Sequence, residues 1–543
     1  MARHESRHFP YRPAPELAGG AAQRRPVAIV GAGPVGLALA IDLALHGVAS
    51  VVLDDNDIVS TGSRAICWSK RTLEIFDRLG VGRRMLSKGV TWKVGRVFLG
   101  DRELYSFDLL PEHGHRMPAF VNLQQYYVEE YLVERCADFP GLIDLRWRNK
   151  VVDAAPRADG VAVAVDTPDG RYSIDADWLV ACDGAHSPVR AMLGLDFAGR
   201  AFEERFLIAD VEMKAEFPPE RLFWFEPTFH EGRSALLHKQ PDDIYRIDLQ
   251  LGREADPEVE RRPERVIPRI RAIVGDRPFA LDWVSVYTFQ CRRLERFVHG
   301  RVVFAGDSAH VVSPFGARGG NGGIQDADNL AWKLATVIRG AAGETLIESY
   351  DEERVRAADE NILNSARATG FMTPRSEVEA AFRKAALDLA RENPFARRFV
   401  NAGRLSVAYS LAGLSLQTPD DAAGGVRPGE VCPDAPVADA EGHAGFLLDH
   451  LGGGFRLLAV SDVAVPDGLD LPVVRVAGSG LADCDGLVDR DRLVAARYGE
   501  GVLYLVRPDQ HVAARFQAPT RAAILAALAR AMGNRPAVDE AVA

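Results

Sequence analysis

Two stretches of the chain share one pattern: a short apolar run, then a glycine-rich turn, then a longer segment with helical periodicity. Residues 27–30 (VAIV) lead into GAGPVG and an apolar helix. Residues 302–305 (VVFA) lead into a loop with five glycines between Pro314 and Gly323, followed by an amphipathic repeat over 324–338. A valine-rich run ended by glycine predicts a buried strand. Two such strand, turn and helix units predict an α/β fold with a Rossmann-like core.

Between these stretches the chain alternates apolar and polar residues, which is typical of antiparallel strands with one buried face. The alternation extends over 201–286, and short strand-like pieces at 90–120 are expected to join the same sheet. Such a sheet can form the wall of a substrate pocket. The residues expected to orient a ring there are aromatic or polar: Trp224, Phe225, His238, Tyr245, Arg246, Asp248 and Tyr287.

The rest of the chain divides by composition. We expect a discontinuous nucleotide-binding domain made of 26–200 and 287–370, followed by a helical segment over 371–417. A linker with proline and glycine at 418–430 then precedes a small α/β domain at 431–543.

Composition narrows the function classes. The formal net charge of −11 argues against a nucleic-acid surface, because phosphate binding needs clustered positive charge. No run reaches the ~20 apolar residues of a membrane helix. The six cysteines are scattered without a CxxC, so we expect no metal site, no disulfides and a cytoplasmic protein. Residues 1–25 lack the apolar segment of a signal peptide and are expected to form a mobile extension.

The first glycine turn carries a dinucleotide signature. Gly31, Gly33 and Gly36 form a complete G-x-G-x-x-G between a strand and a helix, and Asp54 ends the next strand 18 positions later. Glycines at these positions admit a pyrophosphate to the helix N-terminus, and the acid accepts a hydrogen bond from a ribose hydroxyl. The motif predicts ADP-ribose binding, with Asp55 as the alternative to Asp54.

The second glycine turn predicts a site for a flat group that becomes anionic on reduction. Asp307 follows the strand, at the carboxyl end where α/β sheets bind ligands. The glycines beyond Pro314 let the backbone approach a bound group and turn N–H groups toward it. The helix starts where the glycines end, so its positive end faces the loop. The alternative is a tight turn whose glycines serve packing alone.

A third motif, CDGAHSPVR at 182–190, lies between the other two. The three motifs in this order resemble those of the class A flavoprotein aromatic hydroxylases, whose best-known member is para-hydroxybenzoate hydroxylase. The resemblance covers about 26–370. It implies an FAD-binding domain with an inserted, mostly antiparallel substrate sheet.

Two later segments, VRPGEVCPDAPV and YLVRPDQHVAARF, look like the thioredoxin-like domain of phenol hydroxylase and 3-(3-hydroxyphenyl)propionate hydroxylase. The expected fold is therefore completed by a helical segment and a C-terminal thioredoxin-like domain. Without a CxxC, that domain is expected to serve structure or oligomerisation, and we expect a homodimer.

The resemblance assigns FAD contacts residue by residue. The three glycines of the first turn would hold the pyrophosphate and Asp54 the adenosine ribose. Arg64 and Gln125 match two further FAD contacts of the family. Gln125 is preferred to Gln124 because Glu129 then follows at the family's spacing.

The other two motifs would hold the rest of the cofactor. Asp183 and Gly184 match a motif tied to both FAD and NAD(P)H. Asp307 would bind the ribityl chain, and Pro314 would line the active site beside the isoalloxazine. The residues whose backbone N–H groups would meet flavin O2 and N1 are Gly320 and Asn321.

These matches imply a monooxygenase that hydroxylates a small phenolic substrate with NADPH or NADH and O2, through a flavin C4a-hydroperoxide. A polar side chain would deprotonate the phenol or bind a substrate carboxylate. Two departures from many relatives, Arg318 and Asp55, leave open the nicotinamide preference and the charge near the flavin. The candidates for the polar side chain are Tyr245, Arg246, His238 and Asp248.

Other functions stay open at this point. The nearest is another FAD oxidoreductase, such as an epoxidase or a halogenase, although the WxWxIP segment of halogenases is absent and TWKVG at Thr91 is its nearest counterpart. A dehydrogenase that binds NAD at GAGPVG would leave the second glycine loop without a purpose. A flavin-binding sensor would bind FAD yet would not oxidise NAD(P)H faster with any phenol.

Overall fold

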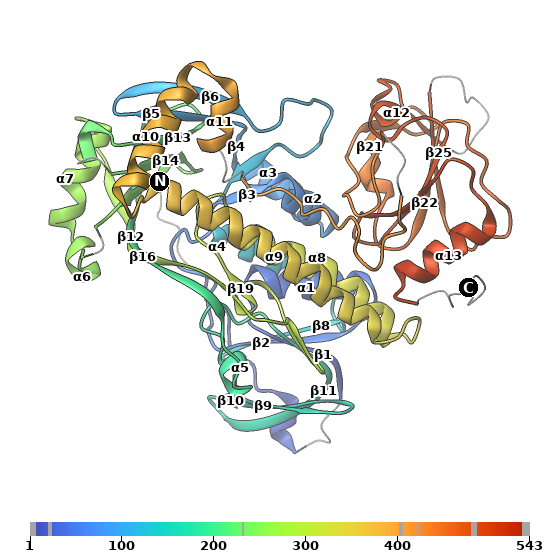
Figure 1. Ribbon diagram of the computed structural model, residues 1–543. Coiled ribbons are helices and arrows are strands. Elements are labelled where there is room, and N and C mark those ends of the chain that lie inside the picture. The colour runs from blue at the N-terminus through green and yellow to red at the C-terminus, as the bar shows by residue number, and fades with distance from the viewer. Residues whose placement is uncertain are drawn as a thin grey trace.

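Three parts surround one long helix in the computed structural model. Figure 1 shows a nucleotide-binding domain, a broad sheet at one end of the molecule and a C-terminal domain at its side, with helix α9 (Thr345–Met372) crossing the middle. The residues that the structure describes are 7–19, 24–230, 233–252, 254–400, 405–420, 424–478 and 486–534.

The nucleotide-binding domain is built on a mostly parallel sheet. Its principal strands are β1 Arg25–Val30, β2 Ser50–Asp54, β8 Ile143–Trp147, β11 Gly170–Ala181, β17 Val298–His299 and β18 Val302–Phe304. They are ordered β17-β18-β11-β1-β2-β8, and all but β17 are parallel. The carboxyl ends of β1, β11 and β18 therefore meet at one edge of the sheet. The three sequence motifs follow these three strands, so the fold brings them together.

Helices cover this sheet, and a hairpin extends it. Helix α1 packs against α8, and both are largely buried. The hairpin β9 (Lys150–Arg157) and β10 (Gly160–Thr167) pairs antiparallel with β11. The helices of the domain are α1 Pro34–Leu45, α2 Lys70–Arg78, α3 Gly82–Lys88, α4 Gln125–Cys136, α5 Pro188–Met192 and α8 Gly319–Ile338.

The second sheet has eight strands and is mostly antiparallel. In chain order these are β5 Val94–Leu99, β6 Arg102–Asp108, β12 Ala198–Glu212, β13 Arg221–Phe225, β14 Ala235–Lys239, β15 Ile244–Gln250, β16 Ala280–Arg293 and β19 His310–Val311. Their order in the sheet is β19-β16-β12-β15-β14-β13-β5-β6, with only β5 and β13 parallel. Residues 94–108 thus supply two strands far from the rest of the sheet in sequence.

One face of this second sheet is covered within its own domain. Helix α7 (Pro263–Val274) packs Val266, Ile270 and Val274 onto it, and short α6 (Pro257–Glu260) precedes α7. The other face turns toward the nucleotide-binding domain. A three-stranded sheet lies between the two, made of β3 Cys67–Ser69, β4 Val90–Trp92 and β7 Phe120–Asn122.

The helical segment predicted over 371–417 is shorter in the structure. Helices α10 (Glu377–Glu392) and α11 (Pro394–Val400) follow α9, but 405–417 contains no helix. The reason is that its backbone bonds run to other segments: Ser406 N–H donates to the Gly316 carbonyl at 2.8 Å, and Leu411 N–H to that of Gly429 at 2.8 Å. This stretch therefore lies against the second glycine loop.

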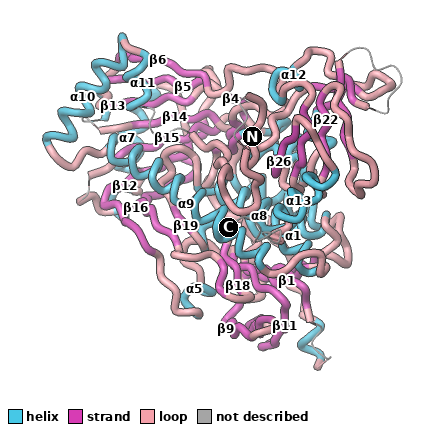
Figure 2. The backbone as a smooth tube through the Cα atoms, turned by 45° about the vertical axis from the view of Figure 1, so that its right-hand side comes forward, coloured by secondary structure: helices cyan, strands magenta, loops and turns pink. Residues whose placement is uncertain are grey.

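The C-terminal domain is a mixed sheet with two helices. Its elements are β20 Pro436–Ala438, β21 Ala444–Phe446, β22 Arg456–Val460, β23 Val473–Ala477, β24 Leu487–Val488, α12 Leu493–Tyr498, β25 Val502–Val506, β26 Val512–Phe516 and α13 Arg521–Ala531. The strand order is β21-β20-β24-β23-β22-β25-β26. In Figure 2 this sheet lies at the upper right and the sheet with β5, β13 and β14 at the upper left, with α1 and α8 lower in the view.

Two segments predicted to be loosely attached pack on the fold. In the extension expected over 1–25, Phe9 N–H donates to the Asp57 carbonyl at 2.7 Å and its ring stacks on Trp147 at 4.6 Å. In the linker expected at 418–430, Gly429 N–H donates to the Val512 carbonyl at 2.7 Å. The described residues of both segments are therefore bound to the rest of the fold.

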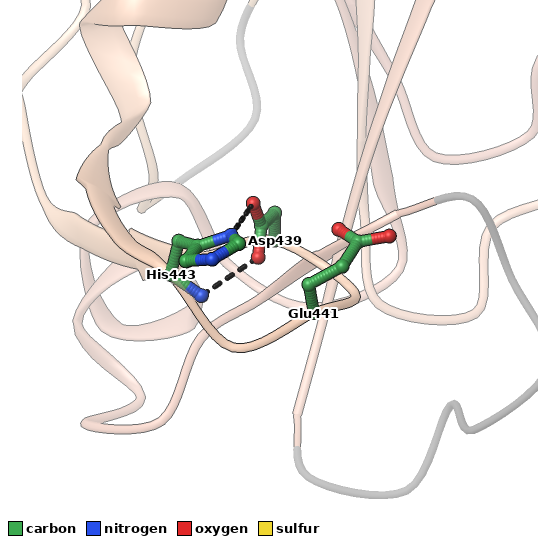
Figure 3. Close-up of side chains that lie close together, drawn as sticks. All are labelled: Asp439, Glu441 and His443. Atoms are coloured by element: carbon green, nitrogen blue, oxygen red, sulfur yellow. Dashed lines mark hydrogen bonds and ion pairs between the residues drawn. The ribbon is translucent and has the colours of Figure 1, made fainter.

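Several absences hold for the described part of the chain. No helix there is both long and apolar enough to cross a membrane. Its cysteines form no disulfide, and Cys484 lies outside the described residues. Figure 3 shows the group that comes nearest to a metal site, at the turn between β20 and β21. There Asp439 accepts from the His443 backbone N–H at 2.7 Å, and its carboxylate lies 2.9 Å from Nδ1 of the His443 ring. Glu441 beside them is exposed, so the group is a surface ion pair.

Candidate active site

The first glycine turn combines tight packing with one open position. A Cβ on Gly31 would lie 2.5 Å from the Cys182 carbonyl, and one on Gly36 would overlap the Gly31 carbonyl. Gly31 also has a φ of +103°, which other residues avoid. At Gly33, the residue preceding α1, the corresponding space is empty. Two glycines are thus required by the fold, and the third leaves room for a ligand at the N-terminus of α1.

Asp54 stands beside this turn, whereas Asp55 does not. Asp54 Oδ2 accepts from the Ala32 N–H at 2.6 Å, and Oδ1 accepts from the Asn56 N–H at 2.9 Å. Burial raises the pKa of Asp54 above its ordinary value, against these hydrogen bonds. Asp55 is exposed. Of the two acids, Asp54 is the one that is bonded to the turn.

The second motif contributes an unsatisfied carboxylate oxygen. Asp183 Oδ2 accepts from the Val189 N–H at 3.0 Å, while Oδ1 is buried and has no partner among the described residues. Burial raises the pKa of Asp183. Gly184 has a φ of +81° and open space where a Cβ would stand. A buried acceptor without a donor beside an open glycine is the arrangement that a ligand hydroxyl would complete.

Arg190 fastens this motif to the next one. Its guanidinium donates to the Ser308 carbonyl at 3.0 Å and to the Ala185 carbonyl at 2.6 Å. The position of the Asp183 motif is therefore fixed relative to the segment that carries Asp307.

One buried carboxylate holds the second glycine loop to α8. Asp326 accepts from the Gly306 N–H at 2.9 Å, lies 2.7 Å from His310 Nε2, and accepts from Arg354 Nε at 2.6 Å. Burial opposes its ionisation, but the charges of His310 and Arg354 outweigh burial and lower its pKa. Asp326 therefore anchors the second glycine loop to α8.

Asp307 is accessible to solvent although protein atoms surround it closely. Desolvation raises its pKa, against the charges of His310 and Arg64. Arg64 is itself exposed, so Asp307 and Arg64 are two solvent-exposed groups of opposite charge.

The start of α8 offers backbone N–H groups. The Gly322 N–H is the first to bond, to the Arg318 carbonyl at 2.7 Å, so those of Gly320 and Asn321 have no intrahelical acceptor. The Asn321 side chain is fully used by the protein: its Oδ1 accepts from the Ser69 N–H at 2.9 Å, and its Nδ2 donates to the Cys67 carbonyl at 2.8 Å. Asn321 can therefore serve a ligand through its backbone only.

Pro314 and Arg318 flank this loop differently. Pro314 is exposed, as a residue lining an open site would be. Arg318 is 2% exposed and donates to Asn361 on α9 at 2.9 Å. Its charge therefore does not face solvent.

Gln125 supports the loop that carries Arg64. Its Oε1 accepts from the Ala65 N–H at 3.1 Å, and its Nε2 donates to Glu129 at 2.8 Å. The amide of Gln124 is buried without a partner among the described residues. Gln125 thus positions a predicted FAD contact, and the sequence did not foresee the unpaired amide of Gln124.

Tyr245 does not belong to the site, because it lies on the wrong face of the sheet. Its hydroxyl donates to the Ala215 carbonyl at 2.6 Å, and its ring packs edge-on against Phe217 on the face covered by α7. Successive residues of a strand point to opposite faces, so Tyr245 and Arg246 cannot both line one pocket. The expectation for Tyr245 is therefore wrong.

The other three candidates lie on the face toward the nucleotide-binding domain. His238 pairs in register with Arg246, and Arg246 with Asp210 of β12. Arg246 donates to Asp248 at 3.0 Å and to the carbonyls of Ser63 and Arg64 at 2.7 and 2.8 Å. Arg246 is thus fully engaged in holding the Arg64 loop against the sheet.

Burial shifts the pKa values of His238 and Asp210, which face the same side of the sheet. Burial, helped by the charges of Arg221 and Arg246, lowers the pKa of His238 well below 6.5. The ring is therefore neutral at pH 7, with Nδ1 4.0 Å from Cys67 Sγ. Burial raises the pKa of Asp210 to about 7, although Ser63 and Gln240 donate to it.

Aromatic side chains form an apolar floor next to this row. Phe315, which follows Pro314, packs its ring against Phe206 at 4.9 Å and Phe289 at 5.3 Å. The loop before α8 therefore rests directly on the sheet face. Burial of these rings excludes water from the space between loop and sheet.

Sequence reasoning missed Arg221, Cys67 and Asp210. Arg221 begins the run RLFWF, in which Arg221, Phe223 and Phe225 share one face by the two-residue period of a strand. Asp210 lies in the otherwise apolar run FLIADV, which was the available signal of a buried acid. Nothing local marks Cys67, which the small sheet brings to His238.

These observations fit FAD. Gly33 and Gly184 leave open space at two turns, and the buried Asp183 Oδ1 has no donor among the described residues. The Asp307 carboxylate is exposed, and the backbone N–H groups of Gly320 and Asn321 have no intrahelical acceptor. Adenine dinucleotides and flavins need this combination of close backbone approach, hydroxyl acceptors and a positive helix end.

Comparison with known proteins gives the same result. A family model described as "FAD binding domain" matches residues 24–365. The chain is 32% identical over 517 residues to 6-methylpretetramide 4-monooxygenase of Streptomyces rimosus, covering 90% of each protein. It is 30% identical over 376 residues to the 3-(3-hydroxy-phenyl)propionate/3-hydroxycinnamic acid hydroxylase of Mycolicibacterium smegmatis, covering 69% of this chain and 66% of that one.

Solved structures share the fold. The flavin-dependent monooxygenase PieE, in complex with FAD and substrate, superposes with a TM-score of 0.79 at 23% identity, over 94% of this chain and 99% of that one. OxyS anhydrotetracycline hydroxylase of Streptomyces rimosus gives a TM-score of 0.69 at 27% identity, over 95% of this chain and all of that one. The chain belongs to the FAD-binding family of flavin-dependent aromatic monooxygenases, as its three motifs predicted.

Proposed function

We propose that this enzyme hydroxylates a phenolic aromatic substrate with NAD(P)H and O2. FAD, when bound, would accept a hydride from the nicotinamide and deliver one oxygen atom of O2 to the ring. The observation that carries the proposal is the aromatic floor of Phe206, Phe289 and Phe315, which lies between a row of polar side chains and the loop of Pro314. A flat phenol would fit such a space.

The protein's own groups have three tasks in this proposal. The N–H groups of Gly320 and Asn321 and the positive end of α8 would stabilise negative charge on the reduced cofactor. The aromatic floor would keep water from the reacting centre. His238, neutral at pH 7, would accept the hydrogen bond of a phenolic hydroxyl and so favour attack by the ring.

The cofactor contacts stand as proposals of the same kind. Gly33 would receive the pyrophosphate, Asp54 the ribose, Asp183 and Asp307 further hydroxyls, and Arg64 a phosphate. Each is supported by an open space, an unfilled acceptor or an exposed charge at the common edge of β1, β11 and β18.

We further propose that the C-terminal domain is thioredoxin-like and has a structural role. The order β23-β22-β25-β26 with α13 last supports this assignment. Cys432, the cysteine described there, is buried and burial raises its pKa to about 12, which disfavours redox exchange. A cytoplasmic homodimer is also proposed, with the exposed apolar side chains of α10 and α11 as its interface: Val378, Phe382, Phe395 and Phe399.

The test is a screen of the purified flavoprotein. NADH or NADPH oxidation and O2 uptake are measured with phenols, hydroxybenzoates, arylpropionates and polycyclic phenols, and products are identified by mass spectrometry. We expect at least one phenol to accelerate both rates and to gain a hydroxyl. Epoxide or halogenated products would favour the alternative oxidoreductases, and a flavoprotein that no phenol accelerates would favour a sensor.

A further inference from the structure

Arg221 is a half-buried cation that has no hydrogen-bond or ion-pair partner among the described residues. Its Nε is buried and unbonded, and no described residue forms a hydrogen bond or ion pair with its guanidinium. Arg246 in the same row is bound to Asp248 and two carbonyls, and Arg96 on β5 is paired with Glu220 and Glu103. An unpaired buried charge costs several kcal/mol, so such groups persist where a ligand supplies the partner.

The sheet register places Arg221 in the cross-strand row that contains His238, Arg246 and Asp210. Leu222 pairs with Leu237, and continuing this antiparallel register by one residue sets Arg221 opposite His238. His238 in turn pairs with Arg246. Side chains opposite each other on neighbouring strands share a face, so Arg221 projects from the face that carries the aromatic floor.

The surroundings of Arg221 lack a counter-charge. The groups whose charges act on it or share its environment are the Cys67 thiol on β3, His238 on β14, and Arg246 and Asp248 on β15. His238 is neutral, burial keeps the Cys67 thiol protonated with a pKa of about 11, and Asp248 already accepts from Arg246. The space beside Arg221 therefore has an excess of positive charge.

Aromatic side chains continue from Arg221 along its own strand. Phe223 and Phe225 share its face, with ring centroids 4.6 Å apart. A ligand that met Arg221 at one end would lie along these rings and the floor formed by Phe206 and Phe289. This face of the sheet thus combines a cation at one end with an apolar surface of several rings.

We propose that Arg221 binds a planar oxyanion of the aromatic substrate, a carboxylate or an acidic enolate, and thereby selects acidic aromatic compounds. The guanidinium would donate two parallel hydrogen bonds to two oxygens held in one plane. This inference rests on the proposed function and names the substrate class of the same site. It also gives Arg246, expected from the sequence to bind a carboxylate, a positioning role instead.

The experiment measures binding to the FAD-loaded enzyme by equilibrium dialysis, which does not depend on turnover. The probes are 3-hydroxy-2-naphthoate, its uncharged carboxamide, and a cyclic 1,3-diketone fused to an aromatic ring, which supplies an enolate. We expect the wild type to bind at least one anionic probe more tightly than the carboxamide. Arg221→Met should weaken binding of that anion roughly 10- to 100-fold, the range for a lost charge-assisted hydrogen bond, and leave the carboxamide unchanged.

Two further variants separate recognition from structure. Arg221→Lys keeps the charge but not the planar fork, so it should recover part of the anion binding and not all of it. Arg96→Met removes an arginine of the same sheet from the opposite face and should change neither probe. FAD content of every variant reports on folding.

The inference is overturned if the wild type binds neither anionic probe more tightly than the carboxamide, or binds none of the probes. It is also overturned if Arg221→Met weakens acid and amide alike. These outcomes are distinct from failure of the proposed function, in which no phenol accelerates NAD(P)H oxidation even though the anion preference and its loss in Arg221→Met are observed.

Discussion

The two ends of helix α8 use polar groups in opposite ways. At its N-terminal end, the backbone N–H groups of Gly320 and Asn321 have no intrahelical acceptor, and the side chains of Asp307 and Arg64 have no hydrogen-bond partner among the described residues. Toward its C-terminal end, fully buried Lys333 donates to Glu353 of α9 at 2.7 Å, and Glu353 also accepts from Arg507 of the C-terminal domain at 2.6 Å.

The difference separates a ligand site from a structural joint. Where the protein supplies every partner, as around Glu353, the charges fix α8 between two domains. At the N-terminal end of α8, contacts such as those of Asp326 hold the loop in place without supplying partners for its polar groups, which leaves these groups available to a ligand. The same contrast distinguishes the two faces of the second sheet: the Tyr245 hydroxyl is hydrogen-bonded on one face, and Arg221 has no partner among the described residues on the other.

The largest expected effect is at the structural joint. Glu353→Gln leaves buried Lys333 without a carboxylate, and breaking a buried ion pair costs about 3–5 kcal/mol. Urea unfolding of the apo-protein measures the loss. Glu352→Gln is the matched control, since its partly exposed carboxylate contacts Ser415 at the surface and should cost less than about 1 kcal/mol. Equal stability of the two variants would contradict the assignment.

A second prediction concerns Asp210 on the site face. Its folded pKa of about 7 exceeds the ordinary value of 3.8, so the folded protein holds a proton that the unfolded chain releases. Stability should therefore fall as pH rises from about 4 to about 7, by up to about 1.4 kcal/mol per pH unit. Asp210→Asn should remove this component, measured as the difference between urea midpoints of the two proteins across that range. Parallel curves would show that Asp210 titrates normally.

A smaller effect is expected at the ligand end of α8. Asp307→Ala removes an accessible carboxylate that no described protein donor satisfies, so stability should hardly change while FAD dissociates more readily. Loss of a charge-assisted hydrogen bond predicts a roughly 10- to 100-fold rise in the Kd for FAD. Fluorescence titration of the apo-protein provides the measurement, and Asp169→Ala, at an exposed turn, is the control. An unchanged Kd would place the ribityl site elsewhere.

The smallest effect separates the two faces of the sheet. Tyr245→Phe removes one hydrogen bond, to the Ala215 carbonyl, and should cost about 0.5–1.5 kcal/mol of stability without changing substrate-stimulated NAD(P)H oxidation. His238→Ala, on the other face, should lower that rate. If Tyr245→Phe slowed the reaction tenfold, the assignment of faces would be wrong.

The parts predicted from sequence are those with local signals. A valine-rich strand, a glycine turn and a helix are neighbours in the chain, so the nucleotide edge at Gly33 and the start of α8 could be located in advance. Parallel strands then bring their carboxyl ends together by rule. The family model and the relatives confirm the FAD-binding family that these motifs indicated.

The features that the sequence did not predict depend on contacts between residues far apart in the chain, or on the absence of a contact. Arg507 and Glu353 are 154 positions apart, so nothing local announces their ion pair. Arg221 is notable because no described residue pairs with it, which only the folded structure can show. The expectation that Tyr245 contacts the substrate could have been avoided from the sequence alone, because strand alternation already places Tyr245 and Arg246 on opposite faces.

Isotope labelling of the product tests the central claim most directly. The phenol that most accelerates NAD(P)H oxidation is converted under ¹⁸O2 in ordinary water, and the hydroxylated product is analysed by mass spectrometry. The account predicts one ¹⁸O atom in the new hydroxyl of each product molecule. A product whose new oxygen comes from water would contradict a monooxygenase.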